Sequence, residues 1–336
     1  MKRFEVDTEN FSKTSQLVGG IAIHLYNSDS LIPYVELFNK SLEEVDHSGI
    51  NKKDLLQLNI NVLYFAHGRT RSYKDSESLA KTILKQFYSK KNKVEEPLIC
   101  VVFDDRNHGD RTVDSSRNSG WTSGNDKHAL DMVSIIDGTV QDIKLIMDYL
   151  PSFLNLEFYL SPSAKENFET KIAYRNGISG TSLGGHIAIR FGYYYPELVE
   201  YINPIIGCSD LSSLLLNRLL KADLTSSSYD IKWFYKDYKE LGLSENQKQK
   251  QYPETFHKYL SNQDIGIFEN YPFSKIRMFA TFGELDKLVP PRLSRLWVEI
   301  YKNTNSDTDV YIQKGAGHEI TAELIDKFTS WLVKYI

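Results

Sequence analysis

This chain of 336 residues has few cysteines, no excess of basic over acidic residues and no long apolar run. Its two cysteines, Cys100 and Cys208, each lie in an apolar run, so buried and reduced thiols are expected rather than a disulfide framework. The net charge of -4 argues against a nucleic-acid partner, because such proteins usually carry a basic patch. No apolar run approaches the length of a membrane span.

The N-terminus also lacks the apolar core of a secretory signal, since residues 1–7 read M-K-R-F-E-V-D. A cytoplasmic protein is therefore expected. The chain is long enough to bury a sizeable core, and it shows no internal repeat and no linker. These features favour one continuous domain with an insertion over a string of separate domains.

Nearly continuous apolar runs alternate with helical patterns along most of the chain. The runs occupy residues 58–66, 98–103, 199–207, 276–282 and 310–312. Buried parallel strands that are covered on both faces read in this way, so a mostly parallel central sheet flanked by helices is predicted. Residues 17–26 are predicted as a first strand with a glycine bend, and the helical pattern of residues 129–150 is expected to end at Pro151.

Residues 180–184 read G-T-S-L-G, which matches the G-x-S-x-G pattern of a nucleophile elbow. In that motif a serine, here Ser182, sits on a sharp turn between a strand and a helix, with its hydroxyl lifted above the sheet. The five-residue pattern is weak by itself. Its flanks strengthen it, because a strand pattern ends just before it and a helical pattern continues after it.

A nucleophilic serine needs a base to take its proton and a carboxylate to orient that base. Downstream of the elbow helix, His257 lies in a helical, aromatic stretch where packing suffices, whereas His318 lies on a loop after a strand and is favoured as the base. Asp286 follows the strand at 276–282 and is favoured as the acid. Glu284, two residues earlier, is the rival, and both could instead be solvated loop carboxylates.

The developing oxyanion needs backbone donors. One is expected from the amide of Leu183 at the start of the elbow helix. The second is expected from the H-G-R sequence after the strand at 58–66, where the Arg69 amide is favoured and Thr70 is an alternative, while His67 is expected to hydrogen-bond within the loop. His108 and His128 flank a long polar loop, but their spacing matches no metal-ligand pattern, so no metal and no cofactor are expected.

Taken together, the motifs resemble the α/β-hydrolase superfamily. They are H-G-R after one strand, D-D-R-N-H-G after the next, G-T-S-L-G-G at the elbow, then G-E-L-D-K-L-V-P and G-A-G-H-E. The superfamily commonly has D-x-R-G-x-G where this chain has D-D-R-N-H-G, a slight departure. The resemblance implies Ser182, Asp286 and His318 as the catalytic triad, and Leu183 and Arg69 as oxyanion donors.

The resemblance covers the chain from about residue 58 to the C-terminus. The alternation of strand and helix patterns breaks at residues 208–272, which predicts a helical cap inserted there into an α/β-hydrolase core formed by residues 1–207 and 273–336. The expected activity is a serine hydrolase that cleaves a carboxylic ester through an acyl-enzyme intermediate, acting on a small-molecule ester or acyl substrate. A peptidase or thioesterase with the same triad, and an idle hydrolase fold that serves as a binding module, are the alternatives. Aromatic and leucine side chains of the cap suggest an apolar substrate group, although plain packing explains them equally well.

Overall fold

The computed structural model describes residues 10–44, 56–91, 94–166 and 170–336. Its strands form one mixed sheet in the order β1-β2-β4-β3-β5-β6-β7-β8. The strands are β1 (Lys13–Val18), β2 (Ile21–Tyr26), β3 (Gln57–Ala66), β4 (Leu98–Phe103), β5 (Lys171–Thr181), β6 (Tyr201–Ile205), β7 (Arg277–Gly283) and β8 (Asp309–Gln313). From β4 to β8 every neighbouring pair is parallel, which confirms the predicted mostly parallel sheet.

The antiparallel edge of the sheet differs from the prediction. Residues 17–26 are not one bent strand, because β1 and β2 form a hairpin and β2 pairs antiparallel with β4. Gly19 and Gly20 make the two-residue turn with φ angles of 55° and 83°. Positive φ at both central residues suits the twist of a tight hairpin, and glycine adopts it at little cost.

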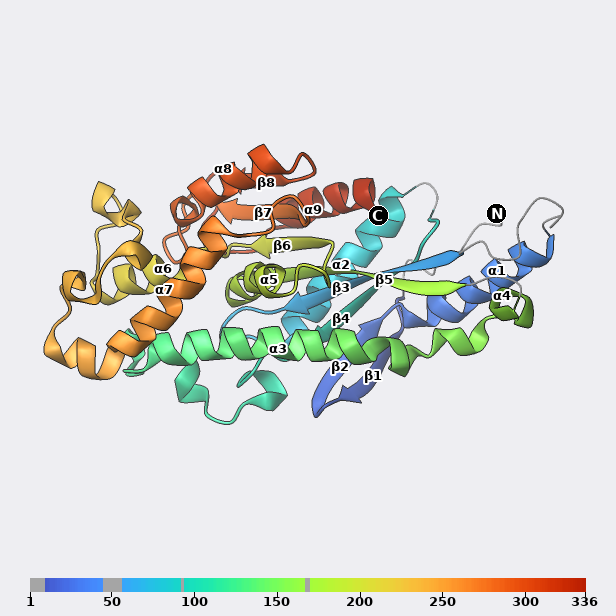
Figure 1. Cartoon of the computed structure of the whole chain (residues 1–336), viewed down its shortest axis with the longest axis horizontal. Coiled ribbons are helices and arrows are strands. Elements are labelled where there is room, and N and C mark those ends of the chain that lie inside the picture. The colour runs from blue at the N-terminus through green and yellow to red at the C-terminus, as the bar shows by residue number, and fades with distance from the viewer. Residues whose placement is uncertain (1–9, 45–55, 92–93, 167–169) are drawn as a thin grey trace.

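Helices cover both faces of the sheet (Figure 1). They are α1 (Leu31–Glu44), α2 (Tyr73–Lys90), α3 (His128–Leu154), α4 (Pro162–Glu166), α5 (Leu183–Tyr194), α6 (Leu211–Leu219), α7 (Glu254–Glu269), α8 (Arg295–Thr304) and α9 (Ala322–Tyr335). The apolar faces of α2 and α9 share one buried cluster, whereas α1, α3, α5 and α8 contribute to the other. The sheet is therefore sandwiched, as its nearly continuous apolar strands require.

The long helix α3 continues beyond the predicted end at Pro151. Proline cannot donate a backbone hydrogen bond, but its carbonyl still accepts one from the amide of Asn155 at 2.8 Å. Asn155 then ends the helix with a left-handed φ of 44°. Among the described residues, no helix is long and apolar enough to cross a membrane. Cys100 and Cys208 are both free and buried, as expected.

Residues 208–272 connect β6 to β7 and contain α6, α7 and several short helical turns, without a strand. In Figure 1 they lie at the end of the sheet toward which β6 and β7 point. The loops that carry the predicted site residues follow the carboxyl ends of β3, β5, β7 and β8. These residues and the inserted segment are thus at the same end of the molecule.

Candidate active site

Ser182 lies between the last residue of β5 and the first residue of α5, with φ 55° and ψ -106°. A positive φ is costly for a residue other than glycine and is found mainly at functional sites. Two glycines make the turn possible: a Cβ on Gly180 would lie 1.9 Å from the Gly184 carbonyl oxygen, and one on Gly184 would lie 2.0 Å from that of Ala66. The strand and helix can approach this closely only with glycine at both positions.

The structure brings Ser182, His318 and Asp286 into one hydrogen-bonded chain. The Nε2 atom of His318 lies 2.9 Å from the Ser182 Oγ, and its Nδ1 atom lies 2.7 Å from the Asp286 Oδ2. Asp286 is buried, and its other oxygen accepts bonds from the amides of Leu288 at 2.8 Å and Val289 at 2.9 Å. With the carboxylate held in this way, Nδ1–H donates to Asp286 and Nε2 is free to accept the serine proton.

The rival residues lie elsewhere. The Glu284 carboxylate accepts the amide of Gly315 at 3.0 Å rather than a bond from His318. The ring of His257 bonds the Lys236 carbonyl at 2.8 Å and the Ser261 hydroxyl at 3.2 Å, within the segment 208–272. Both groups therefore have structural partners.

The two predicted oxyanion donors, Arg69 and Leu183, both lie close to Ser182. Arg69 lines the same cavity as Ser182, and Leu183 follows Ser182 directly. In the part of the chain that the structure describes, neither the Arg69 amide nor the Leu183 amide has an acceptor. The Thr70 hydroxyl donates to the Arg69 carbonyl at 2.6 Å, and Thr70 has a strained φ of 64°.

The His67 ring bonds backbone groups of two loops, the one after β3 and the one after β4. Its Nε2 accepts the Asp105 amide at 3.0 Å, so its Nδ1 carries the proton and donates to the Gly68 carbonyl at 2.8 Å. Burial lowers the pKa of His67 and keeps its ring neutral in this arrangement. The Asp105 side chain beside it is fully buried and has no hydrogen-bond partner on either oxygen, so burial raises its pKa well above the ordinary value.

The cavity in front of Ser182 has a volume of about 500 Å³, which suits a small substrate. Its walls come from the loops after β3, β5, β6, β7 and β8 and from the first turns of α2. The lining residues are His67, Gly68, Arg69, Thr70, Arg71, Asp75, Ser76, Leu79, Thr181, Ser182, Ile206, Leu288, His318, Glu319 and Ile320. Its wall thus combines apolar side chains with the side chains of Arg69 and Arg71, whereas the sequence connected only the backbone amide of Arg69 to the substrate.

None of these lining residues belongs to the segment 208–272. The aromatic side chains of that segment pack on one another instead: the rings of Phe234 and Phe268 are 5.7 Å apart, and those of Tyr252 and Phe256 are 5.0 Å apart. Of the two interpretations of its aromatic content, the structure favours packing over a substrate pocket. Arg218 of α6 does not line the cavity, but it bonds the backbone oxygen of Leu288, which does. Nothing in the sequence marked this contact, because it depends on how α6 packs.

The histidines of the long polar loop also have local partners. The His108 Nδ1 bonds the Arg106 carbonyl at 2.8 Å, and the His128 ring packs edge-on against Trp121, with centroids 4.8 Å apart. Burial lowers the pKa of His108 to about 4 and that of His128 to about 3. Among the described residues, no group of three histidine, cysteine or acidic side chains is arranged to hold a metal ion.

No protein-family model matches the chain, and no curated protein has significant sequence similarity to it. Solved structures do match. TT1662 from Thermus thermophilus is 11% identical, with 96% of this chain and 97% of that chain covered and a TM-score of 0.54. The esterase Pf2001 from Pyrococcus furiosus is 14% identical, with 97% and 92% covered and a TM-score of 0.49. The strand order and the nearly full-length match show the α/β-hydrolase fold.

Proposed function

We propose that this protein is a serine hydrolase that cleaves a carboxylic ester through an acyl-enzyme intermediate. The observation that carries the proposal is the hydrogen-bonded chain from Asp286 through His318 to Ser182, which opens on a cavity of about 500 Å³. Both contacts are within the reach of about 3.2 Å that proton transfer requires. A serine held at a positive φ on a strand-to-helix turn supports the same proposal.

In the first half of the reaction, the Ser182 Oγ attacks the ester carbonyl carbon while its proton passes to the Nε2 of His318. The carbonyl oxygen becomes an oxyanion, which the amides of Leu183 and Arg69 stabilise. Asp286 stabilises the imidazolium that forms. His318 then gives its proton to the alcohol oxygen, the carbon–oxygen bond breaks, and the alcohol leaves with the acyl group bound to Ser182.

In the second half, His318 takes a proton from a water molecule, whose oxygen attacks the acyl carbon. The Oγ of Ser182 leaves with the proton that His318 returns, and the free acid is released. Every proton in this cycle is carried by a residue of the chain or by water. Each amide donor to the oxyanion is worth about 10²- to 10³-fold in rate in enzymes of this kind.

Residues 208–272 act as a helical cap on the core formed by residues 1–207 and 273–336. Their helical content and their position between β6 and β7 support this assignment. A buried ion pair between Arg190 of α5 and Asp264 of α7, with 2.6 Å between the charged atoms, fastens the cap to the elbow helix. This ion pair fixes the position of the cap relative to the helix that follows Ser182.

The test is labelling by a fluorophosphonate, which reacts only with an activated serine. Wild-type protein should be labelled, and Ser182→Ala should not. Ser76→Ala is the matched control, because Ser76 lines the same cavity but has no histidine partner; it should label like the wild type. Folded wild-type protein that takes up no label would contradict the proposal and favour a binding module.

A further inference from the structure

Two partly buried arginines beside the triad have no carboxylate partner. Arg69 lines the cavity, and its Nη1 donates to the backbone oxygen of Asn118 at 2.7 Å. Arg218 donates from Nη2 to the backbone oxygen of Leu288 at 2.5 Å, and Leu288 lines the same cavity. Within the described ranges, neither guanidinium forms an ion pair with an aspartate or glutamate.

The two guanidinium groups approach the same region from different elements, Arg69 from the loop after β3 and Arg218 from α6. Burial is the main cause that lowers the pKa of Arg218 to about 10, and the positive charge of Arg69 lowers it further. Burial also lowers the pKa of Arg69. Burial is also the main cause that lowers the pKa of His128, and the positive charges of Arg69 and Arg218 lower it further. The positive charge of Arg69 thus disfavours the charged form of Arg218.

Elsewhere the chain pairs its buried and partly buried arginines with carboxylates. Arg190 binds Asp264 at 2.6 Å, and Arg175 binds Glu200 at 3.0 Å. A third case is Arg111, whose guanidinium lies 2.8 Å from a carboxylate oxygen. Arg69, which lines the cavity, and Arg218, which bonds the cavity residue Leu288, are therefore exceptions to the way in which this fold neutralises buried positive charge.

Two carboxylates line the cavity, and both are engaged by other groups. Asp75 accepts the amide of Ser72 at 3.2 Å at the start of α2 and lies 3.9 Å from Arg71. Glu319 accepts the amide of Gly317 at 3.4 Å. Among the described residues, neither forms an ion pair with Arg69 or Arg218. The charge of Asp286 raises the pKa of Arg218, but this carboxylate bonds His318 and two backbone amides instead. The positive charge beside the triad is therefore left for a group from outside the chain.

A guanidinium held away from water without a counter-ion is costly, and such costs concentrate at functional sites. The planar fork of arginine matches a carboxylate and binds it through charge-assisted hydrogen bonds. We propose that the substrate is an ester carrying a second, ionised carboxyl group, which Arg69 and Arg218 bind while Ser182 attacks the ester carbonyl. This inference rests on the proposed function and adds the substrate class to it.

The test compares mono-p-nitrophenyl esters of straight-chain dicarboxylic acids, each matched with its neutral methyl ester. Two charge-assisted hydrogen bonds predict a kcat/KM at least about tenfold higher for the best charged ester than for its neutral partner. In Arg69→Met/Arg218→Met, which keeps the Arg69 amide, this ratio should fall to about one. In Arg295→Met, a control at an exposed arginine of α8, it should stay at the wild-type value.

The outcome separates this inference from the proposed function. Labelling of Ser182 by a fluorophosphonate together with a ratio near one in the wild type would overturn the carboxylate inference and leave the hydrolase intact. Loss of labelling would overturn the hydrolase itself. If the protein is labelled but turns over none of these esters, the inference is tested by how well an added ligand protects Ser182 from the fluorophosphonate. The free dicarboxylate should protect at a concentration at least about tenfold below that of its diamide. Equal protection would overturn the inference.

A stability measurement guards against a purely structural role for Arg218. Because Arg218 has no ion pair to lose, Arg218→Met should unfold at a denaturant midpoint no lower than that of the wild type. A clear drop in that midpoint would assign the arginine to support of the fold and would contradict its role in substrate binding.

Discussion

Charged groups are paired in one region of this molecule and unpaired in another. The first region is the seam, meaning the contacts that residues 224–230 and 263–264 make with the rest of the chain. There Arg190 and Asp264 are both buried and 2.6 Å apart, with Gln263 bonding the same guanidinium at 2.7 Å. Asp264 also accepts the amide of Ser212 at 2.6 Å.

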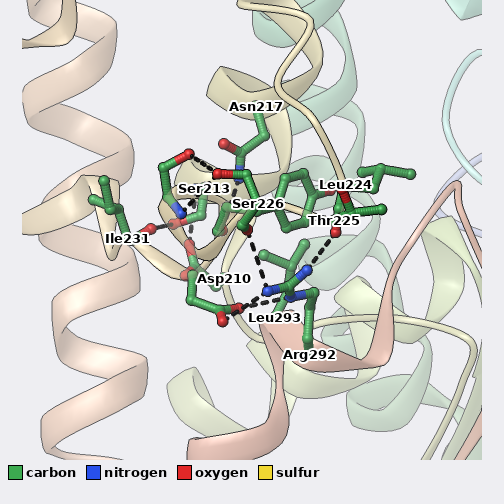
Figure 2. A network of polar contacts seen from close by, with 12 residues as sticks. Asp210, Ser213, Asn217, Leu224, Thr225, Ser226, Ile231, Arg292 and Leu293 are labelled. Carbon is green, nitrogen blue, oxygen red and sulfur yellow. Dashed lines mark hydrogen bonds and ion pairs between the residues drawn. The ribbon is translucent and has the colours of Figure 1, made fainter.

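A second contact of the seam is shown in Figure 2, where Arg292 reaches the backbone oxygens of Leu224 and Ser226. The same side chain forms a two-pronged ion pair with Asp230, at 2.7 and 2.8 Å. Arg292 of the core thus donates several hydrogen bonds to one loop of residues 208–272. Such contacts support a fixed geometry.

The cleft in front of Ser182 is the second region, and it collects costs that the seam avoids. Ser182, Thr70 and Ile206 have φ angles of 55°, 64° and 46°, which are unfavourable for residues other than glycine. Among the described residues, the Asp105 carboxylate has no hydrogen-bond partner, although it lies 3.6 Å from the His67 Nδ1, and Arg69 has no carboxylate counter-ion. Strain and unpaired charge thus mark the region where we propose that the reaction takes place, whereas paired charge marks the seam.

The cleft contains the carboxylate whose replacement should matter most. Asp286→Asn should lower kcat for an ester by about 10⁴-fold with little loss of stability, because an amide cannot hold the His318 tautomer that accepts the serine proton. Steady-state kinetics and a denaturant titration measure both quantities. Glu284→Gln is the matched control, since a neutral oxygen can still accept the Gly315 amide, and its kcat should stay close to that of the wild type. Equal losses in both variants would remove the distinction between the two carboxylates.

In the seam, a smaller effect is expected, and on stability rather than on rate. Asp264→Asn should lower the free energy of unfolding by about 3–5 kcal/mol, because it leaves the Arg190 charge buried without a counter-ion. The double variant Arg190→Met/Asp264→Leu should recover most of that loss in chemical unfolding. Asp230→Asn, which breaks a more exposed pair, should cost less than about 1 kcal/mol. A loss for Asp230→Asn as large as that for Asp264→Asn would contradict this ranking by burial.

A weaker effect still is expected at Asp105, whose pKa burial raises well above its ordinary value. As the pH rises above about 4, the unfolded chain releases this proton while the folded chain keeps it, so the wild type loses stability. Asparagine does not titrate. The stability of Asp105→Asn relative to the wild type should therefore rise between about pH 4 and pH 7, by on the order of 1 kcal/mol for each tenfold difference in proton affinity between the folded and unfolded chains. Urea titrations at several pH values measure this difference, and a constant difference would show that Asp105 is ionised in the folded state.

The sheet and the positions of the site residues could be predicted because both depend on local patterns. Nearly continuous apolar runs indicate buried parallel strands, and the G-T-S-L-G turn depends on glycines that local sterics require. The order of serine, acid and histidine after successive strands then indicates which side chains meet. The sequence favours Asp286 over Glu284 from its position on the loop alone, since the amides that hold Asp286 are recognisable only in the folded loop.

Other features depend on packing that no local pattern encodes. The place of Arg218 beside the cavity follows from how α6 packs, so nothing in its neighbours along the chain marked it. The aromatic side chains of residues 208–272 look alike whether they pack or line a pocket, and only the structure separates the two cases. The turn at Gly19 and Gly20 was recognised as a bend, but the pairing of β2 with β4 is a long-range contact.

The proposed mechanism requires above all that Ser182 carries an acyl group during turnover. Mass spectrometry detects that group if a reaction with a p-nitrophenyl ester is quenched rapidly with acid. We expect a species heavier by one acyl group, with the added mass on the peptide that contains Ser182 and absent from Ser182→Ala. Turnover with no acylated Ser182, or an acyl group on another residue, would contradict the mechanism.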